Sequence, residues 1–379
     1  MPRLLVLNNY SLDRVLIEVG RGDKPAHHLY GIDRFPKLGF AVENLPIGDT
    51  PLRLPSPARR ALRLLPAVGD LRQEFAALQR IGRGDLIYAP CQTQTQFLTY
   101  LRALGILRVP VVTLAHHPLA PNRWPWKLPA LKLQLRGTDA FPSLSTGVAR
   151  EIAELSGRID LSEVVPWGPD LDYYPPSDGS PGVGAIAAGR TDRDFLTFAR
   201  AATRASVRAT ILCLRSENLE RHHEIGPNVA VTAVEKESDL NYRRLVPLLA
   251  AARVHAIPLV AGFGLAGLTS LTDALALGKP VIMTRHPLID IDVEKHRIGR
   301  WVEPGDTAGW TTALRWFEDN PEESAAMGRR ARAFAEERYN SEIFARRMVA
   351  IFEAALSRQS PREAQSEVSN QPLGFPPLI

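Results

Sequence analysis

The sequence predicts an α/β protein built from two doubly wound domains, each a parallel sheet covered by helices. Short apolar, β-branched runs alternate with longer helix-like segments along most of the chain, and this alternation is typical of βαβ units. The 379 residues suffice for two domains of ~100–200 residues each. Prolines cluster in the middle of the chain, so we expect an N-terminal domain over 1–168, a linker over 169–182 and a C-terminal domain over 183–340.

The composition is that of an ordinary globular protein, with 45% hydrophobic and 23% charged residues. Two cysteines, Cys91 and Cys213, make no disulfide framework and favour a reducing compartment, so we expect a cytoplasmic protein. The net charge of +5 favours an anionic partner, such as a nucleotide phosphate or an anionic membrane face. No basic stripe carries interleaved aromatic residues, and specific nucleic-acid binding is therefore not expected.

No apolar run reaches the ~18–20 residues of a membrane span, so the protein is expected to be soluble or peripheral at the inner membrane face. Residues 51–80 interleave arginines with leucines on a helical period. That pattern fits either a helix pair packed on the sheet or a basic amphipathic element that faces a membrane. Residues 122–135 combine tryptophans with lysines, which fits an acceptor-binding or membrane-interface lip as well as ordinary packing.

The first half of the chain ends its strands in polar loops. A loop after the first strand contains Gly22 and His28, and a later strand runs into His116 and His117. Histidines at the carboxyl end of a parallel strand lie where open α/β sheets place their ligands. Three apolar runs are expected to form buried strands in this half: 4–7, 85–89 and 109–118.

The second half of the chain shows the same pattern of apolar strands, polar loops and helices. Its first strand leads into Gly189-Arg190-Thr191, with Arg193 close behind, and a helix is expected to begin near Leu240. Amphipathic helices follow, the last over 341–356, and the Pro/Gln/Ser-rich tail over 357–379 is expected to be disordered. The early strands of this half are expected at 183–188, 209–214 and 229–234.

The stretch 254–287 is the most informative part of the sequence. An apolar run is followed by Gly262, Gly264 and Gly267, then by a helix-like segment that Gly278 ends, then by a second apolar run. A glycine loop before a helix presents backbone N–H groups and a positive dipole end to an anion, most often a phosphate. The alternative is a plain βαβ unit whose glycines only permit tight turns.

The residue pattern of this stretch resembles the donor-sugar loop of GT-B glycosyltransferases, especially retaining enzymes of glycosyltransferase family 4 (glycosyl transferases group 1). The matching residues are Thr269, Leu271, Asp273, Ala274, Ala276, Gly278, Lys279, Pro280, Val281 and Ile282. The strand ending at His116 and the connection with Pro166, Gly168, Asp170 and Tyr174 are similar to further motifs of the family. The resemblance implies two Rossmann-like domains that face each other across a cleft, with the last helix, 341–356, crossing back to the N-terminal domain.

The resemblance also implies roles for individual residues. Arg190 and Arg193 would bind the donor diphosphate together with the loop residues Gly264, Leu265, Ala266 and Gly267. Asp273 would bind the ribose, and His116, the catalytic candidate, would touch the donor sugar or the acceptor. The remaining candidates are a nucleobase region at Val234, Glu235 and Leu240, and acceptor or sugar contacts at Gly22, His28 and His117.

The implied reaction transfers a sugar from a UDP- or GDP-type nucleotide sugar to an acceptor hydroxyl with retention of configuration. The acceptor would be a saccharide, a lipid-linked compound or a small molecule, as in polysaccharide or glycoconjugate biosynthesis. In the family the leaving phosphate accepts the acceptor's proton, so no protein nucleophile, metal or cofactor is expected. The Asp-x-Asp at Asp290 and Asp292 invites a metal interpretation, although a polar turn and helix cap is the interpretation we favour.

One position departs from the family pattern. The family has an acid eight residues before the ribose-binding acid, and here that position is Leu265, while Ala261 precedes the first glycine of the loop. An inactive GT-B partner or regulatory subunit is therefore an alternative to an active transferase. A nucleotide-sugar epimerase or a phosphorylase on the same fold is a further alternative, although no convincing cofactor-binding lysine is found.

Overall fold

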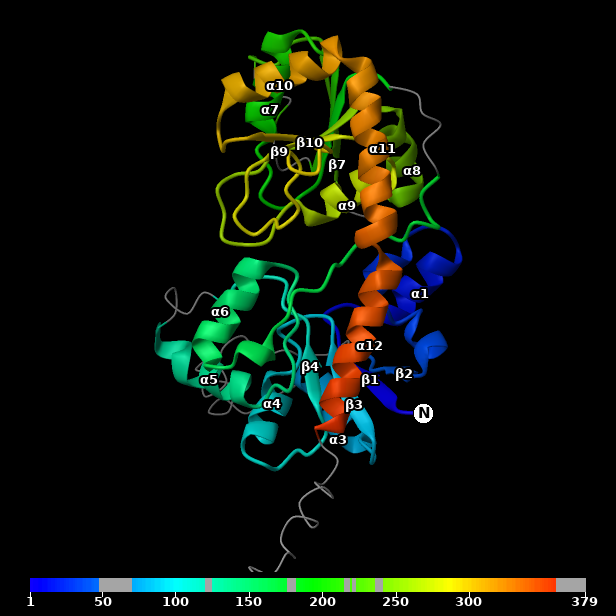
Figure 1. Cartoon of the computed structure of the whole chain (residues 1–379), viewed down its shortest axis with the longest axis vertical. Coiled ribbons are helices and arrows are strands. Elements are labelled where there is room, and N and C mark those ends of the chain that lie inside the picture. Colours follow the sequence, from blue (N-terminus) through cyan, green and yellow to red (C-terminus); the bar gives the residue numbers. More distant parts are fainter. Residues whose placement is uncertain are drawn as a thin grey trace, which may run out of the picture.

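The computed structural model describes residues 1–47, 70–119, 125–175, 182–214, 219, 223–235 and 241–358. Within these residues the chain forms two lobes stacked along the long axis of the molecule (Figure 1). Each lobe contains one sheet whose strands all pair in parallel. The two parallel-sheet lobes confirm the predicted doubly wound α/β fold class.

The N-terminal lobe holds a four-stranded sheet in the order β2-β1-β3-β4. Its strands are β1 (Arg3–Val6), β2 (Ala41–Asn44), β3 (Asp85–Ala89) and β4 (Val111–Thr113). Its helices include α1 (Leu12–Gly20), α3 (Leu71–Arg80), α4 (Gln96–Ala103), α5 (Leu128–Arg136) and α6 (Thr146–Ser156). All residues of β3 and β4 are buried, as expected for parallel strands covered on both faces.

The strand predicted over 109–118 is shorter in the structure. Only β4 is continuous, and isolated bridges join the chain to a neighbouring segment, from Val112 within β4 to Ala140 and from Ala115 beyond β4 to Ser143. Pro142 lies within that segment and has no N–H to donate, which interrupts a regular ladder. Most of the basic helix pair predicted over 51–80 lies outside the described residues; its last part is α3.

The C-terminal lobe holds a six-stranded sheet in the order β10-β9-β8-β5-β6-β7. The strands are β5 (Ala185–Ala188), β6 (Ala209–Leu214), β7 (Val229–Val234), β8 (Val254–Ile257), β9 (Val281–Thr284) and β10 (Gly299–Val302). The helices that cover it include α7 (Phe195–Ala205), α8 (Tyr242–Ala251), α9 (Leu268–Ala276), α10 (Thr307–Asp319) and α11 (Pro321–Arg338). This strand order is that of a dinucleotide-binding Rossmann sheet. Successive strands are added on one side of β5 up to β7 and on its other side from β8 onward, so the switch point lies between β5 and β8.

The last described helix, α12 (Ser341–Ser357), packs on the N-terminal lobe although it follows α11 of the other lobe (Figure 1). Phe352 is fully buried, and its ring centroid lies 5.2 Å from that of Phe35 and 5.1 Å from that of Tyr88. Side chains from α12, η2 (Phe35–Leu38) and β3 thus share one core. The chain therefore crosses between the lobes twice, once through residues 163–175 and once at the α11–α12 junction.

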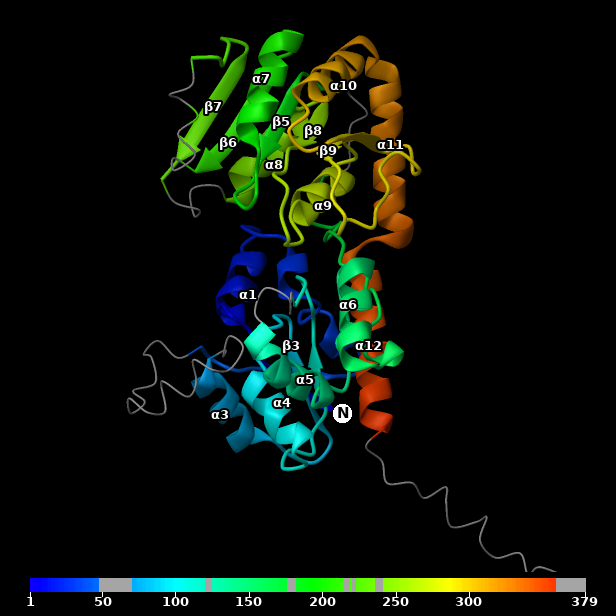
Figure 2. The ribbon, with the colours of Figure 1, turned by 90° about the vertical axis from the view of Figure 1, so that its left-hand side faces the viewer.

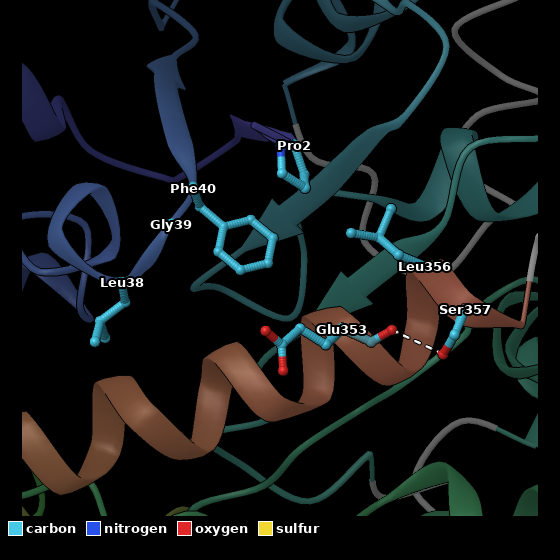
Figure 3. Close-up of a pocket in the computed structure, with 7 residues that line it drawn as sticks. All are labelled: Pro2, Leu38, Gly39, Phe40, Glu353, Leu356 and Ser357. Atoms are coloured by element: carbon cyan, nitrogen blue, oxygen red, sulfur yellow. Dashed lines mark hydrogen bonds between the residues drawn. The ribbon is translucent and has the colours of Figure 1, made fainter.

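A pocket of about 390 Å³ opens beside α12 (Figure 3). It is lined by Pro2, Leu38, Gly39, Phe40, Glu353, Leu356 and Ser357. Pro2 precedes β1, and Phe40 precedes β2, so the pocket lies at the amino ends of these strands. Ligands of doubly wound sheets bind at the opposite, carboxyl edge, and no candidate site residue lines this pocket.

Candidate functional site

The carboxyl edges of the two sheets supply the loops that hold the candidate residues. In the C-terminal lobe the switch point lies between β5 and β8, and open α/β sheets bind their ligands between the loops that follow such a pair of strands. These are residues 189–194 and 258–267. The turned view shows the loops of the upper lobe directed at the lower lobe (Figure 2). The loop after β4, with His116 and His117, meets them from the N-terminal lobe.

The glycine loop leads into α9, whose N-terminus is open. Gly267 is the N-cap residue, with φ of 83° and no side-chain capping bond. A Cβ at Gly267 would lie 2.8 Å from Cε of Met283, 3.1 Å from Cγ2 of Ile257 and 3.2 Å from Cδ1 of Leu259, so backbone conformation and close packing both favour glycine. The first N–H groups of α9 therefore have no side-chain cap and can bind an anion.

His117 contacts the glycine loop across the two lobes. The N–H of Leu265 donates to Nδ1 of His117 at 3.0 Å. Gln92 fixes the backbone beneath it, because its Oε1 accepts from the N–H groups of His116 and His117 at 2.8 and 2.9 Å. Burial lowers the pKa of His117, against the raising effect of the Asp192 charge. His117 is thus held as a neutral acceptor at the loop.

His116 is fixed in one tautomer. Its Nε2 lies 2.6 Å from the carbonyl oxygen of Pro90, and a carbonyl can only accept, so Nε2 carries the proton and Nδ1 is the acceptor. Burial lowers the pKa of His116 to about 4, aided by His117 and opposed by the bond to Pro90. The imidazole is therefore neutral at physiological pH. It is suited to a polar contact with a hydroxyl rather than to proton release.

The two candidate arginines lie on the β5–α7 loop but face different surroundings. Arg190 is exposed. Burial lowers the pKa of His28, and the charges of His27, Lys24 and Arg190 lower it further. Arg193 is half-buried: its Nη2 donates to the hydroxyl of Ser270 in α9 at 2.9 Å. Burial lowers the pKa of Arg193 to about 10, so its guanidinium remains cationic beside the N-terminus of α9.

Asp273 lies on α9 and is only 5% exposed. Its Oδ1 accepts a hydrogen bond from the hydroxyl of Tyr174, in the segment that connects the lobes. Burial raises the pKa of Asp273 to about 7, and the Tyr174 bond acts in the opposite direction. Asp273 thus lies on the helix that directly follows the glycine loop. Its carboxyl group is already hydrogen-bonded to Tyr174.

The predicted nucleobase region is only partly described. Val234 ends β7 and Glu235 follows it, at the edge of the sheet and two strands from β5. Leu240 lies outside the described residues. Tyr242, the first residue of α8, contacts the other lobe, because its hydroxyl lies 2.8 Å from Nε2 of His28.

Gly22 and His28 lie where the lobes meet. The carbonyl oxygen of Gly22 accepts from the Tyr173 hydroxyl at 3.3 Å and from Nε of Arg243 in α8 at 3.5 Å. Arg243 also forms an ion pair with Asp23 at 2.8 Å. The loop that carries Gly22 is therefore bound to the connecting segment and to α8, while His117 and Arg193 are the candidates that contact the glycine loop and the start of α9.

Three residues near the glycine loop were not singled out by sequence: Gln92, Asp192 and His286. Each follows a strand within a few residues, after β3, β5 and β9 respectively, and that position is the signal that could have identified them. His286 is 5% exposed; its Nδ1 accepts from the N–H of Leu288 at 3.2 Å. Its Nε2 is buried and has no hydrogen-bond partner in the described part of the chain.

No group of three or more His, Cys, Asp or Glu side chains in the described residues is arranged to hold a metal ion. Asp290 accepts from the N–H and the hydroxyl of Thr146, at 2.6 and 2.8 Å. Asp292 accepts from the N–H groups of Glu294 and Lys295, both at 3.1 Å. The two aspartates thus act as a lobe contact and as a turn cap.

No helix in the described ranges is long and apolar enough to cross a membrane. No protein-family model matches the chain, and no curated protein matches it by sequence. Solved structures match it along nearly its whole length. Anabaena Alr3699/HepE, solved in complex with UDP-glucose, superposes with a TM-score of 0.65 at 17% identity, covering 93% of this chain and 100% of that one.

Two further matches are similar in extent. Sucrose-phosphate synthase from Thermosynechococcus elongatus has a TM-score of 0.68 at 14% identity and covers 94% of this chain and 100% of its own. A glycosyltransferase from Rickettsia africae has a TM-score of 0.65 at 14% identity, with 94% and 98% covered. At these identities the likeness establishes the fold, which is the GT-B fold of glycosyltransferase structures, and activity must be argued from the site.

Proposed function

We propose that the protein is a retaining glycosyltransferase that moves a sugar from a nucleotide-diphosphate sugar to an acceptor hydroxyl without a metal ion. The observation that carries the proposal is the convergence at the switch point of the C-terminal sheet. There the uncapped N-terminus of α9 lies beside Arg193, Arg190 is on the same β5–α7 loop, and His117 of the other lobe bonds to the glycine loop, next to His116. A diphosphate needs such cationic and N–H groups, and a hydroxyl-rich sugar needs neutral polar ones.

The proposed chemistry asks the protein mainly to stabilise a leaving group. The bond from the sugar's anomeric carbon to the phosphate oxygen breaks, a bond to the acceptor oxygen forms on the same face, and the acceptor's proton passes to the departing phosphate. Negative charge grows on the diphosphate, where Arg190, Arg193 and the N–H groups of α9 would stabilise it. Neutral His116 would contact the donor sugar or the acceptor, and Asp273 would bind the ribose once it turns from Tyr174.

The donor is proposed to be of the UDP or GDP type. The UDP-glucose complex of HepE, which shares this fold, supports a uridine nucleotide as the first to be tested. The acceptor is proposed to reach the site from the N-terminal lobe, in the cytoplasm or at the inner membrane face.

The test is a panel of nucleotide sugars and free nucleotides, including UDP-glucose, GDP-mannose, UDP and GDP. We expect thermal stabilisation by the nucleotides of one base, because ligand binding to the folded state raises the unfolding temperature. We expect release of free nucleotide when a sugar acceptor is added. Absence of stabilisation by every nucleotide would refute the donor site.

An inactive GT-B partner subunit is the second candidate function. The observation that favours it is the apolar pair Ala261 and Leu265 at the positions where the family has an acid. The same panel separates the two functions: stabilisation by a nucleotide together with no nucleotide release for any acceptor supports the partner subunit.

A further inference from the structure

An acidic side chain lies against the glycine loop although the loop itself contains none. Asp192 belongs to the β5–α7 loop, and its carbonyl oxygen accepts from the N–H of Val260 at 3.1 Å. The next residue, Arg193, forms an antiparallel bridge with Leu259, and the N–H of Asp194 donates to the carbonyl of Pro258 at 3.1 Å. These bonds fasten residues 192–194 along the entrance of the glycine loop.

The Asp192 side chain is directed at the glycines. A Cβ built on Gly262 would lie 3.4 Å from Oδ2 of Asp192, and one on Gly264 would lie 4.0 Å from it. The backbone of Asp192 adopts φ of 54°, a left-handed conformation that costs free energy in a residue other than glycine. In the described part of the chain, no side chain or N–H group donates a hydrogen bond to its carboxylate.

Two histidines face this carboxylate from other elements. The charge of Asp192 acts to raise the pKa of His117, from the N-terminal lobe, and that of His286, after β9, while burial lowers both. The bond from the Leu288 N–H to Nδ1 of His286 leaves the proton on Nε2, which is buried without a partner among the described residues. Among the residues that the structure describes, an acceptor and a donor without hydrogen-bond partners thus lie near each other at the carboxyl edge of the C-terminal sheet, and a sugar hydroxyl needs one of each.

We propose that the Asp192 carboxylate binds hydroxyl groups of the transferred sugar, in place of the acid that Ala261 and Leu265 do not supply. His286 is the matching donor. Since a carboxylate repels a second carboxylate nearby, the site selects an uncharged sugar over a uronic acid. This inference rests on the proposed glycosyltransferase function and adds the acid and the sugar class to it.

The test compares Asp192→Asn and Asp192→Gly with the wild-type protein. Asparagine and glycine both tolerate the left-handed backbone, so the loop keeps its conformation while the charge or the whole side chain is removed. Calorimetric titration is done with UDP, UDP-glucose and UDP-glucuronic acid, and with GDP and GDP-mannose in parallel. Thermal denaturation of each variant shows that it is folded.

We expect the variants to bind the free nucleotide as the wild type does. They should bind the neutral nucleotide sugar about tenfold to a hundredfold more weakly, as expected for the loss of a hydrogen bond to a charged group. Wild type should prefer UDP-glucose to UDP-glucuronic acid, and Asp192→Asn should reduce that preference. The control Asp160→Asn, which removes an exposed carboxylate from η5 (Ile159–Leu161) of the N-terminal lobe, should change none of these affinities.

Each other outcome has a definite meaning. If the wild type gains affinity from the sugar and both Asp192 variants keep that gain, Asp192 is not the sugar acid, while the glycosyltransferase proposal stands. Equal losses for UDP and UDP-glucose also overturn the assignment, since they place Asp192 at the phosphates or in the folding of the loop. If the wild type binds no nucleotide at all, the proposed function itself fails.

Discussion

Burial and hydrogen-bond partners determine the protonation states of the histidines between the lobes. His116 and His117 are neutral because burial lowers their pKa values, and each has one nitrogen assigned by a backbone contact. The cations of the candidate donor site are therefore arginines, since Arg193 keeps its charge despite burial. This division suits a site that places a diphosphate at one end and hydroxyl groups at the other.

Arg190→Ala should weaken the binding of nucleotide diphosphates by about tenfold to a hundredfold, because a charged contact to phosphate is removed. Binding of the nucleoside alone should change little. Titration of UDP and uridine, or GDP and guanosine, measures both. Arg208→Ala is the matched control, because Arg208 is exposed just before β6, at the amino edge of the same sheet. Equal losses for nucleotide and nucleoside would remove Arg190 from the phosphate site.

Asp273 should make the free energy of unfolding depend on pH. Its pKa is raised from 3.8 to about 7 in the folded protein, so between these values the folded chain holds a proton that the unfolded chain has released. Stability therefore falls as the pH rises through this window and is level above it. Asp273→Asn lacks this titration. The difference between its urea midpoint and that of the wild type should therefore shift in favour of the variant between pH ~5 and pH ~8.

A constant difference between the two urea midpoints across that range would show that Asp273 does not titrate there. Tyr174→Phe is the companion variant. It removes the hydrogen bond that lowers the pKa of Asp273, and so should move the window to higher pH.

Among the elements, α9 connects the glycine loop to the rest of the lobe. This helix is almost entirely buried and lies between the glycine loop, which precedes it, and α11. Its N-terminus contacts the β5–α7 loop through Ser270 and its bond to Arg193, and Asp273 contacts the connecting segment through Tyr174. Packing on β9 at Gly267 therefore decides where the N–H groups of the first turn lie.

Gly267→Ala should destabilise the protein and weaken nucleotide binding together. The added Cβ would meet Met283, Ile257 and Leu259 at 2.8, 3.1 and 3.2 Å, and the backbone there has positive φ. Gly305→Ala is the matched control, since Gly305 also has positive φ, 73°, but open space around it. Backbone strain alone should cost Gly305→Ala about 1 kcal/mol, and the clash should cost Gly267→Ala about 1–3 kcal/mol more. Equal thermal shifts for both would contradict the packing argument.

At the scale of the whole molecule, the two lobes touch at several places besides the chain crossings. Asp290 of the upper lobe accepts from Thr146 at the start of α6, and Tyr242 meets His28 on another side. Leu265 and His117 make the contact nearest to the glycine loop. Leu288 of the C-terminal lobe also packs on the apolar cluster beneath α6, so apolar packing as well as polar contacts joins the lobes.

Asp290→Ala should shift the protein without ligand toward a more open arrangement, because both bonds to Thr146 are lost. Small-angle X-ray scattering measures this as a larger radius of gyration. Asp290→Asn keeps an acceptor oxygen and should remain close to wild type. An unchanged radius for Asp290→Ala would show that this contact does not hold the lobes together.

The sequence by itself determined the fold class and the candidate loop. Buried parallel strands are apolar runs, and a helix end or a tight turn needs glycine or proline locally, so both are visible in neighbouring residues. The stretch 254–287 therefore predicted a phosphate-type loop, and the runs ending at His116 and Gly189 predicted further loops at the carboxyl edges of the two sheets. Short-range chemistry was enough for these assignments.

Tertiary structure decided which residues complete the site. Asp192 reaches the glycine loop only because residues 192–194 bond to 258–260, far along the chain, and no local pattern specifies that pairing. The tautomer of His116 depends on the Pro90 carbonyl, and the raised pKa of Asp273 on burial under Tyr174 and its neighbours. Charge and proton position respond to every group within a few ångströms, and folding brings those groups together from distant parts of the sequence.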